Sequence, residues 1–142
     1  MPPTTSVEIV TTFLRAFERF EFDVMPVFMD DDVRLLLPTA PAGIERDLVG
    51  KEAFTAFLHH VKLVWKEFKL ARLDVNTLAD SETRVLAEYT SEGTNVDGTP
   101  YRNTYATLVE VVDGKITVFQ EFFDPAPLAN SMKILAAASQ TA

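Results

Sequence analysis

Residues 100–123 read PYRNTYATLVEVVDGKITVFQEFF, and this stretch decides the fold class. Two runs rich in β-branched and aromatic residues flank the dipeptide Asp113-Gly114. Such runs are typical of strands, and Asp-Gly between them favours a two-residue hairpin turn. Two further strand-like segments, residues 68–77 and 82–95, precede the hairpin. The sequence therefore predicts a meander of long antiparallel strands in the second half of the chain.

Helical patterns occupy the first half of the chain. Residues 5–20 begin with the capping-box pair Thr5 and Glu8 and continue with apolar residues at helical spacing. Residues 50–68 show the same period and include Trp65 in their apolar stripe. A short turn or helix is expected between these two segments, and another short helix at the C-terminus. Helices followed by strands predict an α+β domain whose helices pack on one face of a sheet.

The composition indicates a single soluble domain that spans residues 1–142. No apolar run approaches the roughly 18 residues needed to cross a bilayer. The N-terminus lacks the features of a secretory signal, so we expect a cytoplasmic protein that does not bind membranes. With 13 Lys and Arg against 21 Asp and Glu, the net charge is −8, which also disfavours nucleic acid as a partner.

Sequence motifs for cofactors and metals are missing. The chain has no cysteine, Gly-rich phosphate loop, nucleophile elbow or His-x-x-x-His pair, so we expect neither a cofactor nor a metal. The three consecutive aspartates at 30–32 are interpreted as a solvated turn, because adjacent carboxylates on an extended chain cannot converge on one ion.

An uninterrupted hairpin places Glu121 opposite Ala106, on one face with Phe119, Phe123 and Leu108. A carboxyl group among such side chains is desolvated. Desolvation raises its pKa toward neutrality and makes Glu121 a candidate general acid or base.

Two structural alternatives remain open for this glutamate. The carboxylate could pair with Arg34 or Arg102, or a β-bulge could turn it outward to solvent. Structural ion pairs perturb carboxylates as functional sites do, so the pattern alone does not decide between these interpretations.

The other face of the hairpin is also largely apolar, which predicts a homodimer through the sheet. Tyr101, Asn103 and Tyr105 alternate on this other face in ideal register, where they would contribute to the dimer interface or to sheet packing. A single bulge would bring them to the same face as Glu121 instead.

The segments GTPYRNTYATLVEVVDGKITVFQEFFDPAPL and LVGKEAFTAFL resemble the SnoaL-like polyketide cyclases and the phenazine-biosynthesis A/B-like proteins of the nuclear transport factor 2-like superfamily. The resemblance implies a cone of about three N-terminal helices packed in a strongly curved antiparallel sheet, with a pocket inside and a dimer through the sheet. It also implies that the acid five residues after the isoleucine of DGKI projects into the pocket as general acid and base. That residue is Glu121.

The chain departs from these families at two positions. Phenazine-type proteins carry a pocket histidine on the helix after the VG motif, where an ungapped match places Phe57. His60 lies beside Phe57 on a helical wheel and is the second catalytic candidate, with a histidine bonded to backbone or solvent as the alternative. Steroid isomerases of the same fold use an aspartate where this chain has Leu37, so their chemistry is not expected.

The favoured interpretation is a cofactor-independent enzyme that isomerises, cyclises or dehydrates an apolar cyclic or polyketide-like molecule. The alternative is a non-catalytic carrier or sensor with the same pocket. The residues expected to contact the ligand are Phe13, Phe17, Phe57, Trp65, Leu108, Phe119 and Phe123.

Overall fold

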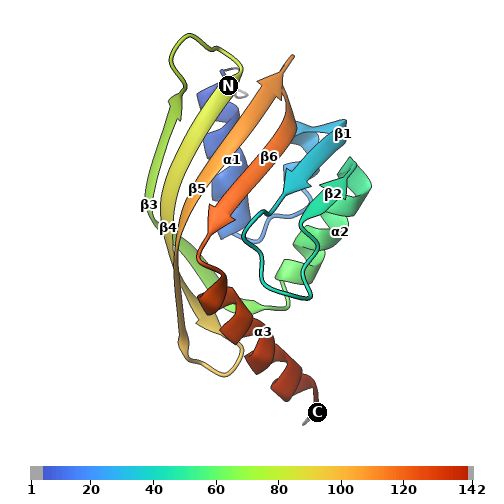
Figure 1. Ribbon diagram of the computed structural model, residues 1–142, viewed down its shortest axis with the longest axis vertical. Coiled ribbons are helices and arrows are strands. Elements are labelled where there is room, and N and C mark those ends of the chain that lie inside the picture. Colours follow the sequence, from blue (N-terminus) through green and yellow to red (C-terminus); the bar gives the residue numbers. More distant parts are fainter. Residues whose placement is uncertain (1–4, 141–142) are drawn as a thin grey trace.

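One strongly curved sheet dominates the computed structural model, which describes residues 5–140 (Figure 1). Its six strands are β1 (Met29–Leu36), β2 (Asp47–Val49), β3 (Trp65–Thr77), β4 (Arg84–Asn95), β5 (Pro100–Val112) and β6 (Lys115–Phe123). They lie side by side in the order β2-β1-β6-β5-β4-β3. The four strands from β3 to β6 form the predicted antiparallel meander.

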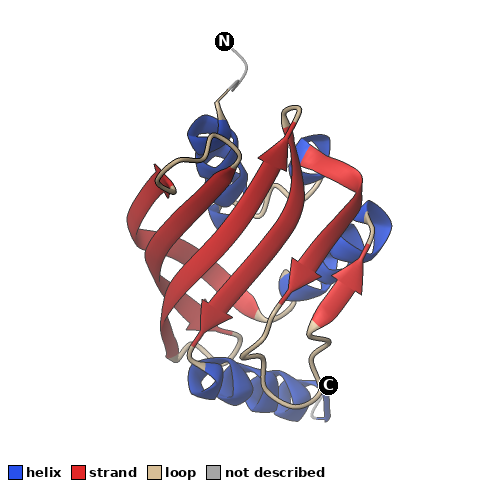
Figure 2. Cartoon of the chain, turned by 45° about the horizontal axis from the view of Figure 1, so that its top comes forward, coloured by secondary structure: helices blue, strands red, loops and turns tan. Residues whose placement is uncertain are grey.

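Three α-helices and a single-turn 3-10 helix complete the fold: α1 (Ser6–Glu18), η1 (Met25–Phe28), α2 (Lys51–Val61) and α3 (Pro125–Gln140). Helices α1 and α2 lie against the same face of the sheet, and α3 lies across one end of it (Figure 2). The predicted α+β class is confirmed. The N-terminal helices are α1, the short η1 and α2. No helix within residues 5–140 is long and apolar enough to span a bilayer.

The sheet is mixed, whereas the resemblance implied an antiparallel one. Strand β1 runs parallel to β6, and all other neighbouring strands are antiparallel. No tight turn joins these two strands, because most of the chain lies between them. Their relative direction is therefore free of the hairpin constraint that makes the other pairs antiparallel.

The second helix ends earlier than its apolar period predicted. Helix α2 stops at Val61, and Trp65 begins strand β3. The register of β3 shifts between Trp65 and Glu67, so Trp65 and Phe68 both turn inward and are 7% and 6% exposed. Two inward residues three apart imitate helical spacing, which explains the wrong prediction for residues 62–68.

A bulge in β6 overturns the predicted register of the terminal hairpin. Asp113 and Gly114 form the expected turn, with φ angles of 51° and 77°. Val112 pairs with Lys115 and Val111 with Ile116, as predicted. Glu110 then lies opposite Val118, so Thr117 is an extra residue in β6. The Thr117 hydroxyl donates to Glu110 Oε1 at 2.7 Å.

The bulge changes the neighbours of the site carboxylate. Glu121 lies opposite Thr107, whereas Ala106 lies opposite the exposed Phe122. Tyr105 lies opposite Phe123, so the tyrosine-bearing face of β5 is the inner one. The predicted pairing of Glu121 with Ala106 is therefore wrong. The alternative in which a bulge brings Tyr101, Asn103 and Tyr105 to the same face as Glu121 is confirmed.

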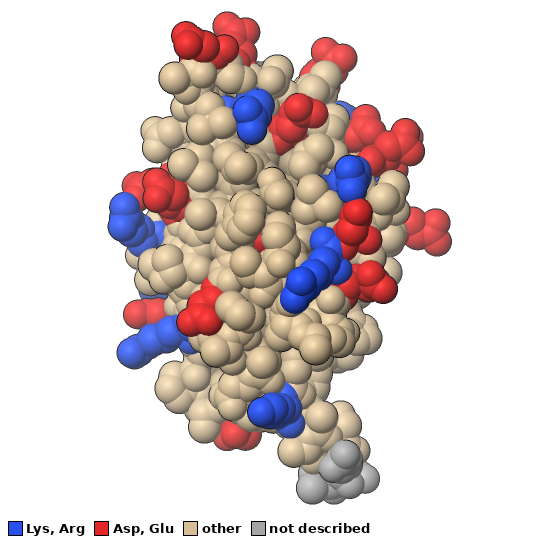
Figure 3. Space-filling model, in the orientation of Figure 1, with Lys and Arg blue, Asp and Glu red and all other residues tan. Residues whose placement is uncertain are grey.

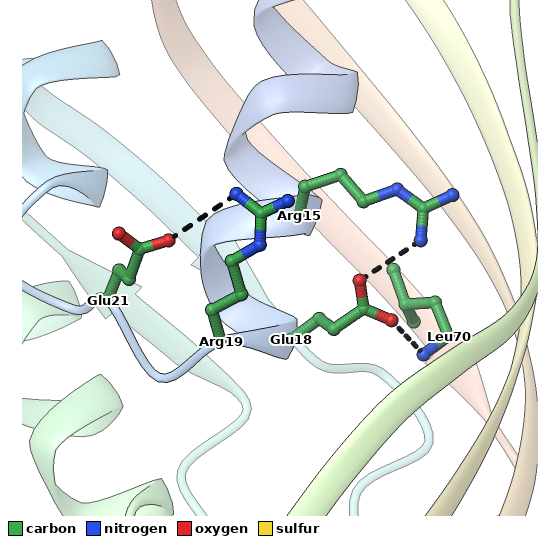
Figure 4. Close-up of polar contacts among 5 residues, drawn as sticks. All are labelled: Arg15, Glu18, Arg19, Glu21 and Leu70. Carbon is green, nitrogen blue, oxygen red and sulfur yellow. Dashed lines mark hydrogen bonds and ion pairs between the residues drawn. The ribbon is translucent and has the colours of Figure 1, made fainter.

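Helix α1 is fixed at both ends. At its start, the Thr5 hydroxyl accepts from the Glu8 N–H at 3.1 Å and Glu8 Oε1 accepts from the Thr5 N–H at 3.2 Å, as the capping box predicted. Near its end, Glu18 accepts from the backbone N–H of Leu70 at 2.6 Å and from Arg15 at 3.1 Å (Figure 4). Because Leu70 adjoins a bulge in β3, Glu18 binds the helix to the sheet where the strand bends.

Helix α3 is attached to the end of the sheet by a buried polar contact. Asp124 caps the helix, because its carboxylate accepts from the Ala126 N–H at 3.1 Å. The Trp65 indole donates to Ser131 Oγ at 3.2 Å, and Ser131 donates to Asn95 Oδ1 at 2.5 Å. These bonds make the C-terminal helix part of the packed structure. The helix has 16 residues and is longer than predicted.

Candidate functional site

A cavity of about 430 Å³ lies between the inner face of the sheet and the helices. Most of its walls are aromatic and aliphatic. Six of the predicted ligand contacts line it: Phe13, Phe17, Phe57, Trp65, Phe119 and Phe123. The prediction for Leu108 is wrong, because the bulge in β6 leaves Leu108 opposite Gln120 on the outer face.

Glu121 projects into this cavity from β6. The Tyr89 hydroxyl donates a short hydrogen bond to Glu121 Oε2. Thr107 Oγ1 lies 2.7 Å from the Tyr89 oxygen. Because Tyr89 uses its single proton on the carboxylate, Thr107 must donate to Tyr89. The three residues therefore form one directed chain that ends on the acid.

The second carboxylate oxygen of Glu121 remains available to a ligand. Within the described part of the chain, Oε1 has no hydrogen-bond donor, and no buried side-chain oxygen or nitrogen lacks a partner. Oε1 is therefore not enclosed by protein. The cavity includes Glu121 in its wall, so this free oxygen is the atom that a bound molecule can reach.

Burial raises the pKa of Glu121 from 4.5 to about 7, against the opposing effect of the hydrogen bond from Tyr89. A carboxyl group with this pKa exists in both protonation states near neutral pH. It can therefore accept a proton in one step and return it in the next.

Neither structural alternative for Glu121 is found. Arg34 binds Asp47 at 2.7 Å on the surface, and Arg102 is exposed on the outer side of β5. Among the described residues, Glu121 has no cationic partner. The bulge, which could have turned it to solvent, turns it inward instead.

A second polar chain lies on the same wall. Asn103 Nδ2 donates to the Tyr101 oxygen at 2.9 Å, Tyr101 and Tyr105 are joined by a 2.9 Å hydrogen bond, and Tyr105 lies 2.9 Å from Ser91 Oγ. Burial raises the pKa of Tyr101 to about 12 and that of Tyr105 well above its usual value. Both tyrosines therefore remain protonated and able to donate at ordinary pH.

Ring stacking joins the two chains. The rings of Tyr89 and Tyr105 lie 4.7 Å apart at an angle of 16°. The charge of Glu121 contributes to the raised pKa values of both Tyr101 and Tyr105, which places the acid and the tyrosine chain in one electrostatic environment.

His60 lines the cavity from α2, with its side chain exposed. Among the described residues its side chain has no hydrogen bond or ion pair, and none links it to Glu121. The neighbouring His59 lies on the surface, with Nε2 3.6 Å from Asp23. The structure thus places His60 at the cavity without a partner that would fix its role.

The sequence interpretation missed Tyr89, the one side chain among the described residues that hydrogen-bonds to the acid. Its signal was present, because Val85, Ala87, Tyr89 and Ser91 alternate along a strand of the meander. Placing Tyr89 beside Glu121 required the register between β5 and β6, which the bulge determines. Within residues 5–140, no group of three or more His, Asp or Glu side chains could hold a metal ion.

Comparison with known proteins agrees with this architecture. Residues 10–119 match the SnoaL-like domain, so the chain belongs to the SnoaL-like domain family. The matched range ends two residues before Glu121. The uncharacterized protein YesE of Bacillus subtilis (strain 168) is 30% identical over 100 residues, which cover 68% of this chain and 65% of YesE.

Solved structures share the fold over most of the chain. A candidate polyketide cyclase from Xanthomonas campestris pv. campestris is 25% identical with a TM-score of 0.73, over 92% of this chain and 96% of that one. An NTF2-like protein from Anabaena variabilis ATCC 29413 is 22% identical with a TM-score of 0.72, over 83% and 88% of the two chains. The resemblance to SnoaL-like and nuclear transport factor 2-like proteins is confirmed.

Proposed function

We propose that this protein is an acid–base enzyme that moves a proton within a small apolar molecule. The observation that carries the proposal is Glu121, a carboxyl group with one oxygen open to an apolar cavity and a pKa of about 7. The reaction class is isomerisation, cyclisation or dehydration of a cyclic or polyketide-like substrate. Similarity to a candidate polyketide cyclase supports this class.

The geometry supports a different role for each of the two residues, Glu121 and Tyr89. Glu121 Oε1 takes a proton from a carbon next to a carbonyl group, and the electrons of the C–H bond form an enolate. The same carboxyl group then returns the proton to this carbon or to another atom of the substrate. Tyr89 holds Oε2 throughout, which fixes the direction in which Oε1 points.

Deuterium exchange tests this chemistry without knowledge of the natural substrate. 1-Tetralone, a neutral bicyclic ketone, exchanges its C2 hydrogens in D2O when a base removes them, and NMR follows the loss of the signal. The wild-type protein should accelerate this exchange. Glu121→Gln should lower the catalysed rate roughly 100-fold or more, because it retains the shape but not the base.

Glu88→Gln is the matched control. Glu88 adjoins Tyr89 in the same strand but is exposed and lies opposite Ala106 on the outer face. The control should exchange 1-tetralone at the wild-type rate. Wild-type protein that binds 1-tetralone but leaves its exchange at the buffer rate would contradict the enzyme proposal and favour a carrier with the same pocket.

A further inference from the structure

The tyrosine chain in the cavity wall contains one more hydroxyl proton than it can use internally. Its three hydroxyl groups, on Ser91, Tyr105 and Tyr101, are joined by two hydrogen bonds of 2.9 Å each. Asn103 donates to Tyr101 and accepts no hydroxyl proton from the chain. Three protons and two links leave one proton over, which lies on Ser91, on Tyr101 or, when both neighbours donate to it, on Tyr105.

These three positions differ in their surroundings. In the first arrangement the surplus proton is on Ser91 Oγ; Ser91 is 2% exposed, and its only side-chain hydrogen bond among the described residues is to Tyr105. A buried donor without an acceptor is unfavourable. In the other two arrangements the surplus proton is on Tyr101 or Tyr105, and both of these residues line the cavity. A molecule in the cavity can then accept it.

The lining of the cavity limits what that molecule can be. No Lys or Arg is among the described lining residues, whereas Glu45 and Glu121 are. A carboxylate or phosphate ligand would therefore enter without a lysine or arginine partner. A neutral molecule that offers an acceptor oxygen, with apolar rings around it, meets both the surplus donor and the aromatic walls.

We infer that the linked hydroxyl groups of Tyr101 and Tyr105, held by Ser91 and Asn103, form a carbonyl-binding site that selects neutral cyclic ketones. The catalytic role of this site rests on the proposed function, whereas the prediction that the site binds ketones does not. When Glu121 removes a proton beside the carbonyl, negative charge moves to the carbonyl oxygen. A donor already aimed at that oxygen stabilises the enolate more than the ketone.

A pair of probes of nearly equal shape tests the site. 1-Tetralone carries the carbonyl group and tetralin lacks it, and calorimetry or the fluorescence of Trp65, the single tryptophan, gives both dissociation constants. The wild-type protein should bind 1-tetralone more tightly by roughly two- to tenfold, beyond any difference in their transfer from water. The double variant Tyr101→Phe, Tyr105→Phe should remove this preference and bind tetralin as the wild type does.

Glu121→Gln separates this inference from the proposed function. The Gln variant should lose deuterium exchange and keep its preference for 1-tetralone. If the double variant keeps the preference, the carbonyl site is elsewhere and the inference is wrong, whatever the exchange assay shows. Equal binding of the two probes by the wild type, or no binding of 1-tetralone, would also overturn it.

Infrared spectroscopy of the wild-type complex gives a second test, in case the double variant does not fold. A hydrogen bond lowers the carbonyl stretching frequency of bound 1-tetralone relative to the ketone in hexane. At about pH 9, Glu121 is ionised and cannot donate, whereas the raised pKa values keep Tyr101, Tyr105 and Tyr89 protonated. A lowered frequency at this pH supports the tyrosine donor. A frequency that returns to the hexane value would contradict it.

Discussion

At Glu121, burial and hydrogen bonding act on the carboxyl group in opposite directions. Burial disfavours the charged form, while the short bond from Tyr89 favours it. Burial has the larger effect, so the pKa rises to about 7 rather than remaining at 4.5. A single neutral hydroxyl donor thus leaves the acid near neutrality, where a cationic partner such as arginine would have lowered its pKa.

This balance predicts that Glu121 lowers the stability of the protein as pH rises. Because the folded pKa of about 7 exceeds the ordinary value of 4.5, folding opposes ionisation. The free energy of unfolding should fall between these two pH values and level off above the upper one. The total loss is about 3 kcal/mol.

Glu121→Gln should remove this loss while keeping an acceptor for Tyr89. Denaturant unfolding of both proteins between about pH 4 and pH 8 measures the effect. The variant should gain stability relative to the wild type as pH rises, since the other titrating groups are shared. A variant that is less stable at neutral pH, with the difference vanishing in acid, would show a stabilising ion pair instead.

At the scale of single elements, how far the sequence predicts the structure depends on the bulges. Hydrophobic alternation and the Asp113-Gly114 turn correctly predict the strands and the hairpin. One extra residue, Thr117, then shifts the pairing of β5 with β6 by one residue, so the opposite face of β5 lies on the same side of the sheet as Glu121. This reversal brings Tyr101 and Tyr105 into the cavity and moves Leu108 out. Nothing in the local sequence marks Thr117 as the bulge, because its stabilising contact with Glu110 forms only after pairing.

Strands β3 and β4 also approach each other closely at one residue, which gives a prediction for Gly93. A Cβ atom at this position would lie 2.7 Å from the Glu67 carbonyl oxygen and 3.6 Å from the Tyr101 ring. Because the close neighbour is backbone, the strands must move apart. Gly93→Ala should destabilise the protein by about 2 kcal/mol.

Thr90→Ala in the same strand is the control for Gly93→Ala. Thr90 is partly exposed and has no side-chain hydrogen bond among the described residues. It should change the free energy of unfolding by less than about 1 kcal/mol. Denaturant midpoints of the two variants provide the comparison, and equal effects would show that Gly93 is not a site of close approach.

At the scale of the whole molecule, the sheet has two different faces. Its inner face carries the cavity, and its outer face is mostly uncharged in the middle, over β5 and β6 (Figure 3). The uncharged outer residues on adjacent strands include Leu86, Ala106, Leu108, Val118 and Phe122. Phe122 is 37% exposed and lies among these uncharged residues, so the exposed apolar surface is continuous across adjacent strands.

We propose that this outer face joins two copies of the chain, as the apolar hairpin predicted. An isologous interface places the same uncharged strands of both copies against each other and keeps the charged rim in water.

Sedimentation at micromolar concentration should show a dimer for the wild type. Leu108→Glu should weaken the dimer roughly 100-fold or more, because a carboxylate would be buried there without a partner. Val27→Glu adds the same charge at an exposed position of η1 and should leave the dimer intact. A monomeric wild type, or a Leu108→Glu variant that remains dimeric, would show that the apolar outer face is not the interface.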